Sequence, residues 1–376
     1  GECVRYGQSR VRGCTLEQCW QECLDKSQYA LKEEAIYAFN TKNKRVKRGL
    51  SIVPIKFTPS MMTKSAMKGS ALVRVYPDGT VLLCHGGIEM GQGLHTKMIQ
   101  VAATALGINP QWIHINETST ETLANTSPTG GSSGTDLNGP AVLDACQIVN
   151  ARLEPFKKLD PSGSWMSWVQ AALQARVCLT VVGHYDKSPV DYDPVTQTGD
   201  PFAYFTYGCC AVQAEVNCYT GEVSVLTADI VMDIGKSLNP NIDVGQIEGA
   251  FMMGLGSVTT EQLKRDLATG KLLSSGPDNY KIPTVSDVPQ ELNVYLLEHN
   301  TAGPTSAVYS SKGIGEPGIL SCAATLLAIK QAIKSFREDR GSRQWFSLEP
   351  PCTAEKIIGW AHGLDTLKDS SSFIDM

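Results

Sequence analysis

The sequence predicts an α+β fold (mixed α/β), with hairpins and mixed sheets packed against helices. Apolar and polar residues alternate on both sides of a turn at residues 71–84 and again at 211–232, as they do in antiparallel hairpins. Other segments repeat apolar residues at helical spacing, most clearly at 319–336. The order of strands and helices is irregular, without a Rossmann order or an internal repeat. A chain of 376 residues with 42% hydrophobic residues is long enough to bury such cores.

The expected elements of the first half follow from local patterns. Thr15 and Gln18 have the spacing of a capping box, and Pro54 restricts its strand to a sheet edge or a bulge. The charge run at 42–48 is expected to be a solvated linker. The predicted order is a helix at 15–40, the linker, a strand at 50–57, hairpin arms at 71–76 and 80–84, a helix at 94–106, a short strand at 112–116 and a helix at 139–153.

The second half is expected to contain a helix at 165–177, then a polar surface excursion up to residue 200. A hairpin with arms at 211–217 and 223–232, a small-residue helix at 244–256, a strand at 292–297 and a helix at 319–336 follow. After Arg337 the sequence is polar and weakly patterned. We therefore predict an incoming linker at 1–14, one domain at 15–340 and a C-terminal tail at 341–376.

Composition and charge exclude several functions. The net charge of −5 provides no broad basic surface, so nucleic acid is not an expected partner. No uninterrupted apolar run approaches membrane-spanning length, so no membrane is expected. The 12 cysteines lack a framework spacing, which indicates reduced thiols and a cytoplasmic location. The start lacks an initiator Met and a signal-peptide pattern, so we expect a longer parent polypeptide.

Two glycine-rich segments are candidates for holding an anionic cofactor. Gly91-Gln92-Gly93 precedes the helix at 94–106, where unpaired N–H groups and the helix dipole suit a phosphate. In residues 130–134, Ser132 and Ser133 add hydroxyls to the backbone amides, as in an anion-binding nest. Either segment taken alone also fits an ordinary tight turn.

Glu316 is the candidate acid/base group. It follows the glycines of Ser311-Lys312-Gly313-Ile314-Gly315 and precedes the apolar helix at 319–336. A carboxylate held in this position costs stability unless it has a partner or a task. The alternative is an acid near a helix N-terminus that the dipole stabilises, but that role does not explain the glycines before it. No nucleophile elbow, histidine cluster, Walker loop or dinucleotide fingerprint accompanies it.

Together these stretches resemble the C-terminal molybdenum-cofactor domain of the eukaryotic xanthine dehydrogenase/aldehyde oxidase family. Each motif alone is weak, but all occur in family order between about residues 15 and 340. The matching stretches are His85–Met98, Asp136–Gly139, Asp229–Gly235, Gly245–Phe251 and Ser311–Glu316.

The resemblance implies roles for individual residues. Glu316 matches the catalytic base of the family, and Gln92 lies in the loop beside the pterin. Residues Gly131, Ser132, Ser133 and Gly134 match the loop that holds the pterin and its phosphate, and Gln246 matches a glutamine that contacts the cofactor. The family holds molybdenum through the pterin dithiolene, so no protein side chain is expected as a metal ligand.

The implied activity is that of a molybdenum hydroxylase, which uses water as the oxygen source. It oxidises small aldehydes to carboxylic acids and hydroxylates N-heterocycles. Electrons then leave through two 2Fe-2S clusters to FAD, both on the missing N-terminal part. We expect the chain to need the rest of its own polypeptide, to be inactive alone and to form a homodimer. The alternatives are a xanthine dehydrogenase/oxidase and a non-catalytic remnant or assembly module.

One position favours the aldehyde oxidase branch. Met61 replaces the Phe with which xanthine dehydrogenases pack against the purine, and Met fills a pocket without imposing planarity. Gly130-Gly131-Ser132, in place of Ala-Ala-Ser, agrees with this branch, whereas Pro317 after Glu316 is the xanthine dehydrogenase form. Met61 could also be a plain core residue.

Overall fold

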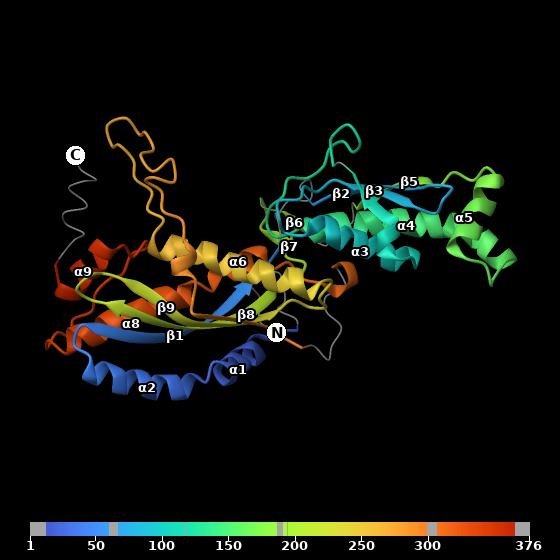
Figure 1. Ribbon diagram of the computed structural model, residues 1–376. Coiled ribbons are helices and arrows are strands. Elements are labelled where there is room, and N and C mark those ends of the chain that lie inside the picture. The colour runs from blue at the N-terminus through green and yellow to red at the C-terminus, as the bar shows by residue number, and fades with distance from the viewer. Residues whose placement is uncertain are drawn as a thin grey trace.

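Two four-stranded sheets, each covered by helices, form two lobes that lie beside one another (Figure 1). The computed structural model describes residues 13–59, 67–116, 118–185, 191–193, 195–298 and 307–364. We call residues 67–200 the inserted lobe. The terminal lobe comprises the described residues before it and those after residue 203, so the first and last described elements, α1 and α9, both belong to it.

In the terminal lobe the strand order is β1-β8-β9-β10. Strands β1, β8 and β9 are antiparallel, whereas β10 runs parallel to β9. Pro54 lies in the edge strand β1, as its missing N–H group predicts. One face is covered by α1 and α2 and the other by α6 and α8 (Figure 1). The bounds are α1 Leu16–Lys26, α2 Tyr29–Lys42, β1 Val46–Phe57, β8 Thr206–Asn217, β9 Val223–Asp233, α6 Pro240–Thr259, β10 Glu291–Leu296 and α8 Ala323–Glu338.

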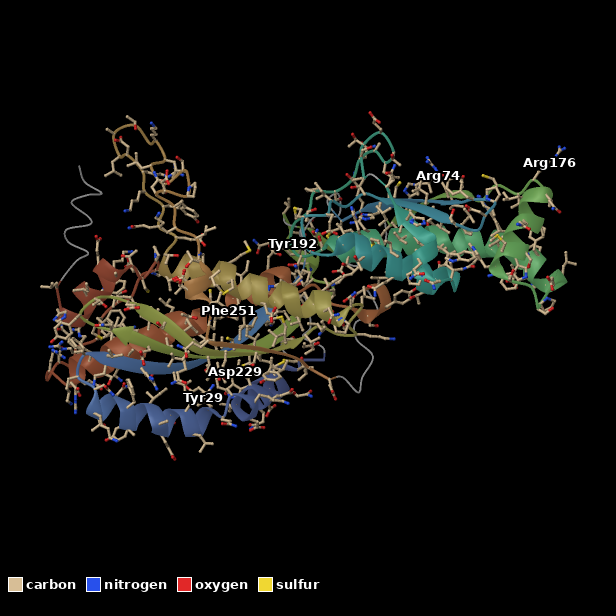
Figure 2. All side chains as sticks on the ribbon, in the orientation of Figure 1. Tyr29, Arg74, Arg176, Tyr192, Asp229 and Phe251 are labelled. Carbon is tan, nitrogen blue, oxygen red and sulfur yellow. The ribbon has the colours of Figure 1, made fainter. Side chains whose placement is uncertain are left out.

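The two faces of this sheet have different chemistry. Phe251 of α6 is fully buried in the main apolar core on the face shared with α8. Asp229 of β9 is buried on the α1–α2 face, where it binds Lys32 at 2.9 Å and accepts a hydrogen bond from Asn293 at 2.9 Å. Figure 2 labels Phe251 and Asp229 on the two sides of the sheet. The carboxylate is tolerated there because two donors satisfy it.

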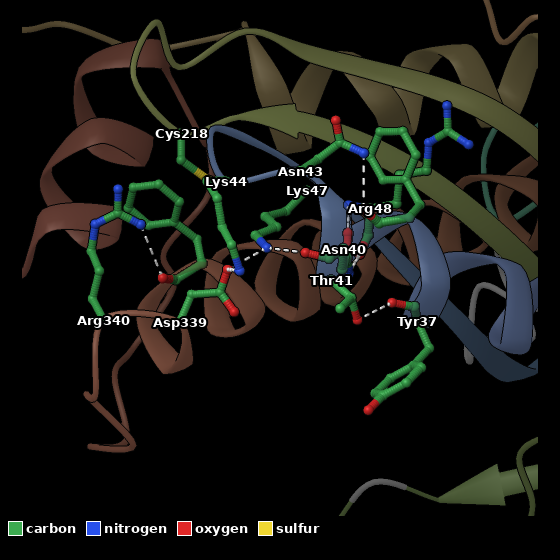
Figure 3. A network of polar contacts seen from close by, with 12 residues as sticks. Tyr37, Asn40, Thr41, Asn43, Lys44, Lys47, Arg48, Cys218, Asp339 and Arg340 are labelled. Carbon is green, nitrogen blue, oxygen red and sulfur yellow. Dashed lines mark hydrogen bonds and ion pairs between the residues drawn. The ribbon is translucent and has the colours of Figure 1, made fainter.

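The expectation of a solvated linker at residues 42–48 is wrong. β1 begins at Val46, and the side chain of Lys47 is 0% exposed. Its ammonium lies 2.8 Å from the Asp339 carboxylate and donates to the Asn40 carbonyl (Figure 3). Asn40 also exchanges hydrogen bonds of 2.8 Å with the backbone of Arg48. These contacts join α2, β1 and the end of α8, so the charge run is part of the packed structure.

In the inserted lobe the strand order is β4-β3-β2-β5. The predicted hairpin is confirmed as β2 and β3, and β4 adds in parallel to β3. β5 lies in the stretch expected to be a surface excursion and pairs antiparallel with β2. The bounds are β2 Gly69–Val75, β3 Val81–His85, α3 Leu94–Leu106, η2 Pro110–Trp112, β4 Ile113–Ile115, α4 Gly134–Leu159, α5 Trp165–Gln174, β5 Thr180–Tyr185, β6 Asp191–Asp193 and β7 Thr198–Asp200.

Two local expectations near the N-terminus are wrong. The helix predicted at 15–40 is broken between α1 and α2, because Gln28 adopts a left-handed conformation (φ 52°). Thr15 makes no capping bond. Its hydroxyl donates instead to Asp233 at 2.6 Å, at the end of β9. The hydroxyl of Thr15 therefore donates to a distant carboxylate instead of accepting from a local N–H group.

The segment after residue 341 packs on the terminal lobe through α9. Cys352, Ile357 and Trp360 belong to the same apolar core as Phe251. The predicted domain boundaries remain predictions. The remaining elements are η3 Val285–Asp287, η4 Val308–Ser310, α7 Gly315–Leu320 and α9 Ala354–His362.

Among the described residues, one helical stretch, Gly315–Glu338, is long and apolar enough to cross a membrane, with a mean hydropathy of 1.3. Half of that window is buried inside the protein. Its buried side chains, such as Ile329 and Ile333, lie in the main core, which is the pattern of a core helix.

Candidate active site

A cavity of about 670 Å³ lies where loops and helices of the two lobes meet. The inserted lobe supplies lining residues between 90 and 97 and between 129 and 136, and the terminal lobe supplies others between 246 and 253 and between 311 and 319. Segments more than 200 residues apart in the sequence therefore share one space. Six of the predicted site residues line it: Gln92, Gly131, Ser132, Gly134, Gln246 and Glu316.

Glu316 is bound by Ser132 through both its side chain and its backbone. The Ser132 hydroxyl donates to Glu316 Oε2 at 2.7 Å and accepts a hydrogen bond from the Glu316 N–H at 2.9 Å. Ser132 has a positive φ of 55°, next to Gly131 at 60°. This left-handed pair turns the chain so that the serine hydroxyl faces the first turn of α7. The carboxylate is exposed to the cavity and yet fixed in direction.

The chain before Glu316 is held on the end of β9. The Lys312 N–H donates to the Ile234 carbonyl at 2.9 Å, and its ammonium lies 2.6 Å from Asp233. Lys312 is thus paired with Asp233. Burial favours the neutral form of Asp233, but Lys312, Thr15 and the Gly235 N–H hold its pKa below the usual value.

A second contact holds Gly313. Its N–H donates to the Tyr204 hydroxyl at 2.8 Å, and that hydroxyl donates to Asp136 Oδ2 at 2.5 Å. Asp136 lies in the first turn of α4 and lines the cavity. Burial raises the pKa of Asp136 to about 7, although Tyr204 and Lys97 favour its charged form.

The expected anion site at the start of α3 is already occupied. The carboxylate of Glu89 accepts hydrogen bonds of 2.9 Å from the N–H groups of Gly91, Gly93 and His95. Burial opposes the charge of Glu89, but these bonds hold its pKa below the usual value. The chain thus provides its own anion at this helix N-terminus. Gln92 lines the cavity, with its amide bound to Ile88 and Met90 of the same loop.

Two neighbouring histidines, His85 and His95, lie against this loop. His85 Nδ1 accepts a hydrogen bond from the Gly87 N–H at 3.1 Å, and His85 Nε2 lies 2.9 Å from His95 Nδ1. Burial and the neighbouring His95 lower the pKa of His85 to about 4, so it is neutral at pH 7. In the part of the chain that the structure describes, no cluster of three His, Cys, Asp or Glu side chains is arranged as a metal site.

The other predicted site residues lie differently. The hydroxyl of Ser133 donates to the Gly130 carbonyl at 2.7 Å, and the residue is buried rather than on the cavity wall. Its role as a cofactor contact remains a prediction. Met61 lies outside the described residues.

Asp136 and Tyr204 are site residues that the sequence did not reveal. Asp136 stands in a motif that carries the family resemblance, but its role depends on Tyr204, 68 residues further along the chain. Tyr204 has no local pattern that marks it. Only the folded chain brings it to Gly313.

Comparison with known proteins places these features in a family. The family model described as "Molybdopterin cofactor-binding domain" matches residues 22–289. The chain belongs to this family. The segment that supplies Gln92, Ser132 and Gln246 lies within the matched range, whereas Glu316 follows it.

Curated relatives come from two enzyme groups. The chain is 47% identical to xanthine dehydrogenase/oxidase of Mus musculus and 44% identical to aldehyde oxidase 1 of Cavia porcellus, over 95% of its length in each case. It spans 27% and 26% of those relatives, about a quarter of their length. The two groups are therefore similar to this chain to nearly the same degree.

Solved structures share the fold. Aldehyde oxidoreductase from Desulfovibrio gigas superimposes with a TM-score of 0.78 at 21% identity, covering 96% of this chain and 37% of that one. Carbon monoxide dehydrogenase from Oligotropha carboxidovorans gives a TM-score of 0.79 at 19% identity, covering 96% and 46%. The mixed α/β fold predicted from the sequence is confirmed.

Proposed function

We propose that the parent polypeptide is a molybdenum hydroxylase in which Glu316 is the general base. The observation that carries this proposal is the position of Glu316, which lines the same cavity as the cofactor loops and is oriented by Ser132. A general base must lie within reach of the proton that it accepts, and this carboxylate lies on the wall of the space that would hold cofactor and substrate.

The cavity fits a molybdopterin. Gly91 and Gly131 have positive φ values of 93° and 60° and present bare backbone to the cavity, as close approach of a flat ring system requires. Gln246 adds an amide that can both donate and accept. We assign the pterin and its phosphate to the loop of Gly131, Ser132, Ser133 and Gly134. We place Gln92 in the loop beside the pterin and assign a further cofactor contact to Gln246.

The residues of this chain have separate tasks in the proposed reaction. When bound, the cofactor would accept the two electrons of the oxidation and provide the oxygen atom, which derives from water. Glu316 accepts the proton at Oε1 or Oε2, and Ser132 keeps the carboxylate aligned by binding Oε2 and the amide. Because the carboxylate is held before substrate arrives, little rotational entropy is lost at the reaction step.

The rest of the proposed enzyme lies outside this chain. We assign FAD and two 2Fe-2S clusters to the N-terminal part of the parent, and we propose a cytoplasmic homodimer. The chain alone should be inactive, because it spans only about a quarter of the length of its curated relatives.

Substitution of Glu316 by Gln tests the base assignment. In the parent enzyme, Glu316→Gln should bind the cofactor and lose turnover by a factor of at least about 10²–10⁴, as removal of a general base does. Molybdenum content and steady-state turnover are the measurements. Glu222→Gln, at the exposed β8–β9 turn, is the matched control and should keep full activity. Near-normal turnover of a fully loaded Glu316→Gln enzyme would refute the assignment.

For the substrate we propose aldehydes and varied N-heterocycles, with Met61 in the pocket. Gly130 and Gly131 support this choice through the family resemblance. The second candidate, xanthine, is supported by the xanthine dehydrogenase/oxidase relatives, which are 46–47% identical, against 44% for the aldehyde oxidases.

Kinetics on the parent enzyme decide between these substrates. We expect kcat/KM for benzaldehyde to exceed that for xanthine, because a Met contributes none of the roughly 0.5–1.5 kcal/mol that a stacked aromatic ring adds. Met61→Phe should shift the ratio toward xanthine. A wild-type preference for xanthine would favour the xanthine dehydrogenase alternative.

A further inference from the structure

We propose that Tyr204 is a positioning residue for Glu316, because its hydroxyl fixes Gly313 to Asp136 at the start of α4. This inference rests on the proposed function of Glu316 for its consequence in catalysis. The contacts themselves belong to this chain alone and can be tested without turnover.

The Tyr204 hydroxyl lies at the centre of a chain of hydrogen bonds. It accepts from the Gly313 N–H at 2.8 Å and donates to Asp136 Oδ2 at 2.5 Å. Tyr204 is 9% exposed, so water competes little for these bonds. The pKa of Tyr204 lies well above its usual value, through burial and the adjacent Asp136, so the hydroxyl keeps its proton. Because the Gly313 N–H can only donate, the hydroxyl accepts from it and directs its own proton to Asp136.

Gly313 is held on both of its backbone polar groups. Thr206, two residues after Tyr204, donates its hydroxyl to the Gly313 carbonyl at 2.8 Å. A Cβ on Gly313 would lie 2.5 Å from the Ser132 carbonyl oxygen and 2.8 Å from the Pro59 ring. The backbone at Gly313 is thus clamped between the approach to β8 and the 130–134 loop, and no larger residue fits there.

We call the contacts of Gly313 with Tyr204, Thr206 and the 130–134 loop the clamp. Gly313 lies three residues before the proposed base. Gly313 is tied to α4 through Tyr204 and Asp136, and Glu316 is tied to the loop before α4 through Ser132. Both ties join the inserted lobe to the loop of the terminal lobe that carries the carboxylate. Loss of the Tyr204 contact should loosen this loop, while the contacts of Ser132, Thr206 and Lys312 remain.

The first test is hydrogen–deuterium exchange on the full parent polypeptide. Tyr204→Phe keeps the ring and removes the acceptor of the Gly313 N–H, so amides of residues 311–318 should exchange roughly tenfold faster. Tyr219→Phe is the matched control: it loses one hydroxyl contact, to Arg340, at the far end of the sheet. It should leave exchange in residues 311–318 unchanged.

A rescue pair separates orientation from packing. In Asp136→Asn the amide oxygen can still accept from Tyr204, so exchange in residues 311–318 should stay slow. Asp136→Ala removes the acceptor and should give the fast exchange of Tyr204→Phe. Equal exchange in these two Asp136 variants would overturn the proposed link.

The second test is turnover of the cofactor-loaded parent. For Tyr204→Phe we expect kcat to fall about tenfold with KM within roughly twofold, because misplacing a catalytic group weakens the reaction step more than substrate binding. Unchanged exchange in residues 311–318 would overturn the proposal. So would fast exchange with normal kcat, if Glu316→Gln is inactive. Fast exchange with normal turnover in both variants would instead support the clamp and overturn the base assignment.

Discussion

At Glu316 a single hydroxyl, that of Ser132, binds both the backbone amide and the carboxylate. A side chain fixed at both ends has lost its rotamer freedom in the folded state. The same principle operates in the terminal lobe at Lys47, whose buried ammonium is fixed by Asp339 and Asn40 (Figure 3). In each case at least one partner, Ser132 or Asp339, comes from a distant part of the chain.

Removal of the Asp339 carboxylate should therefore destabilise the terminal lobe. Asp339→Ala leaves the Lys47 ammonium buried without its counter-charge, and we expect a loss of about 2–3 kcal/mol in the free energy of unfolding, less than for a fully buried pair. Asp339 keeps 25% side-chain exposure, which is the reason for the smaller figure. Urea unfolding of the chain gives the measurement.

The control for this prediction is Glu338→Ala, one residue earlier on α8. Glu338 forms an exposed ion pair with Lys334 at 3.8 Å, so its loss should change the free energy of unfolding by less than about 0.5 kcal/mol. Equal effects of the two substitutions would show that the Lys47 contact contributes nothing specific.

At the residue scale, the sequence predicts those site residues that a local pattern marks. The glycines before Glu316 and around Ser132 indicated a site, and the structure brings those residues to one cavity. Lys47 was misjudged, because a lysine in a charge run looks solvated, and the sequence did not indicate that Glu89 binds the N–H groups of its own loop. The true surroundings of Lys47 are set by segments that fold onto it.

At the element scale, α8 lies directly on β1. A Cβ on Gly49 would come within 1.9 Å of the Ala328 carbonyl oxygen. Helix and strand therefore touch backbone to backbone at this point, without an intervening side chain. Such contact requires glycine, and it fixes the position of α8, the helix that follows α7 and Glu316.

Substitution at this contact should be costly. Gly49→Ala forces α8 away from β1, and we expect a loss of about 3 kcal/mol, at the upper end for overpacking. Gly245→Ala on α6 is the control, because a Cβ there meets nothing within 4 Å. It should be neutral or stabilise the chain by up to about 1 kcal/mol. Thermal unfolding of both variants would test this, and equal midpoints would contradict the close contact.

Elements with local partners were predictable and those with distant partners were not. Both hairpins are confirmed, because a turn and its two arms are adjacent in the sequence. β5 was missed: its partner β2 lies about 110 residues earlier, and only that pairing makes residues 180–185 a strand. The break at Gln28 was missed because no glycine or proline near it marks the end of a helix.

At the scale of the whole molecule, the candidate site belongs to neither lobe alone. The inserted lobe brings Gln92 and Ser132, and the terminal lobe brings Gln246 and Glu316. The sequence indicated these residues one by one, but not that an insertion places them around one cavity. The chain spans about a quarter of its curated relatives, so the remaining walls of the site are assigned to the parent polypeptide.

A crystal structure of the cofactor-loaded parent enzyme with a slowly reacting aldehyde or heterocycle tests this account most directly. We predict the pterin in the cavity lined by Gln92, Ser132 and Gln246. We also predict a Glu316 carboxylate oxygen within about 2.6–3.2 Å of the reacting group, directly or through one water. A cofactor bound elsewhere, or a Glu316 carboxylate turned away from the substrate, would contradict the account.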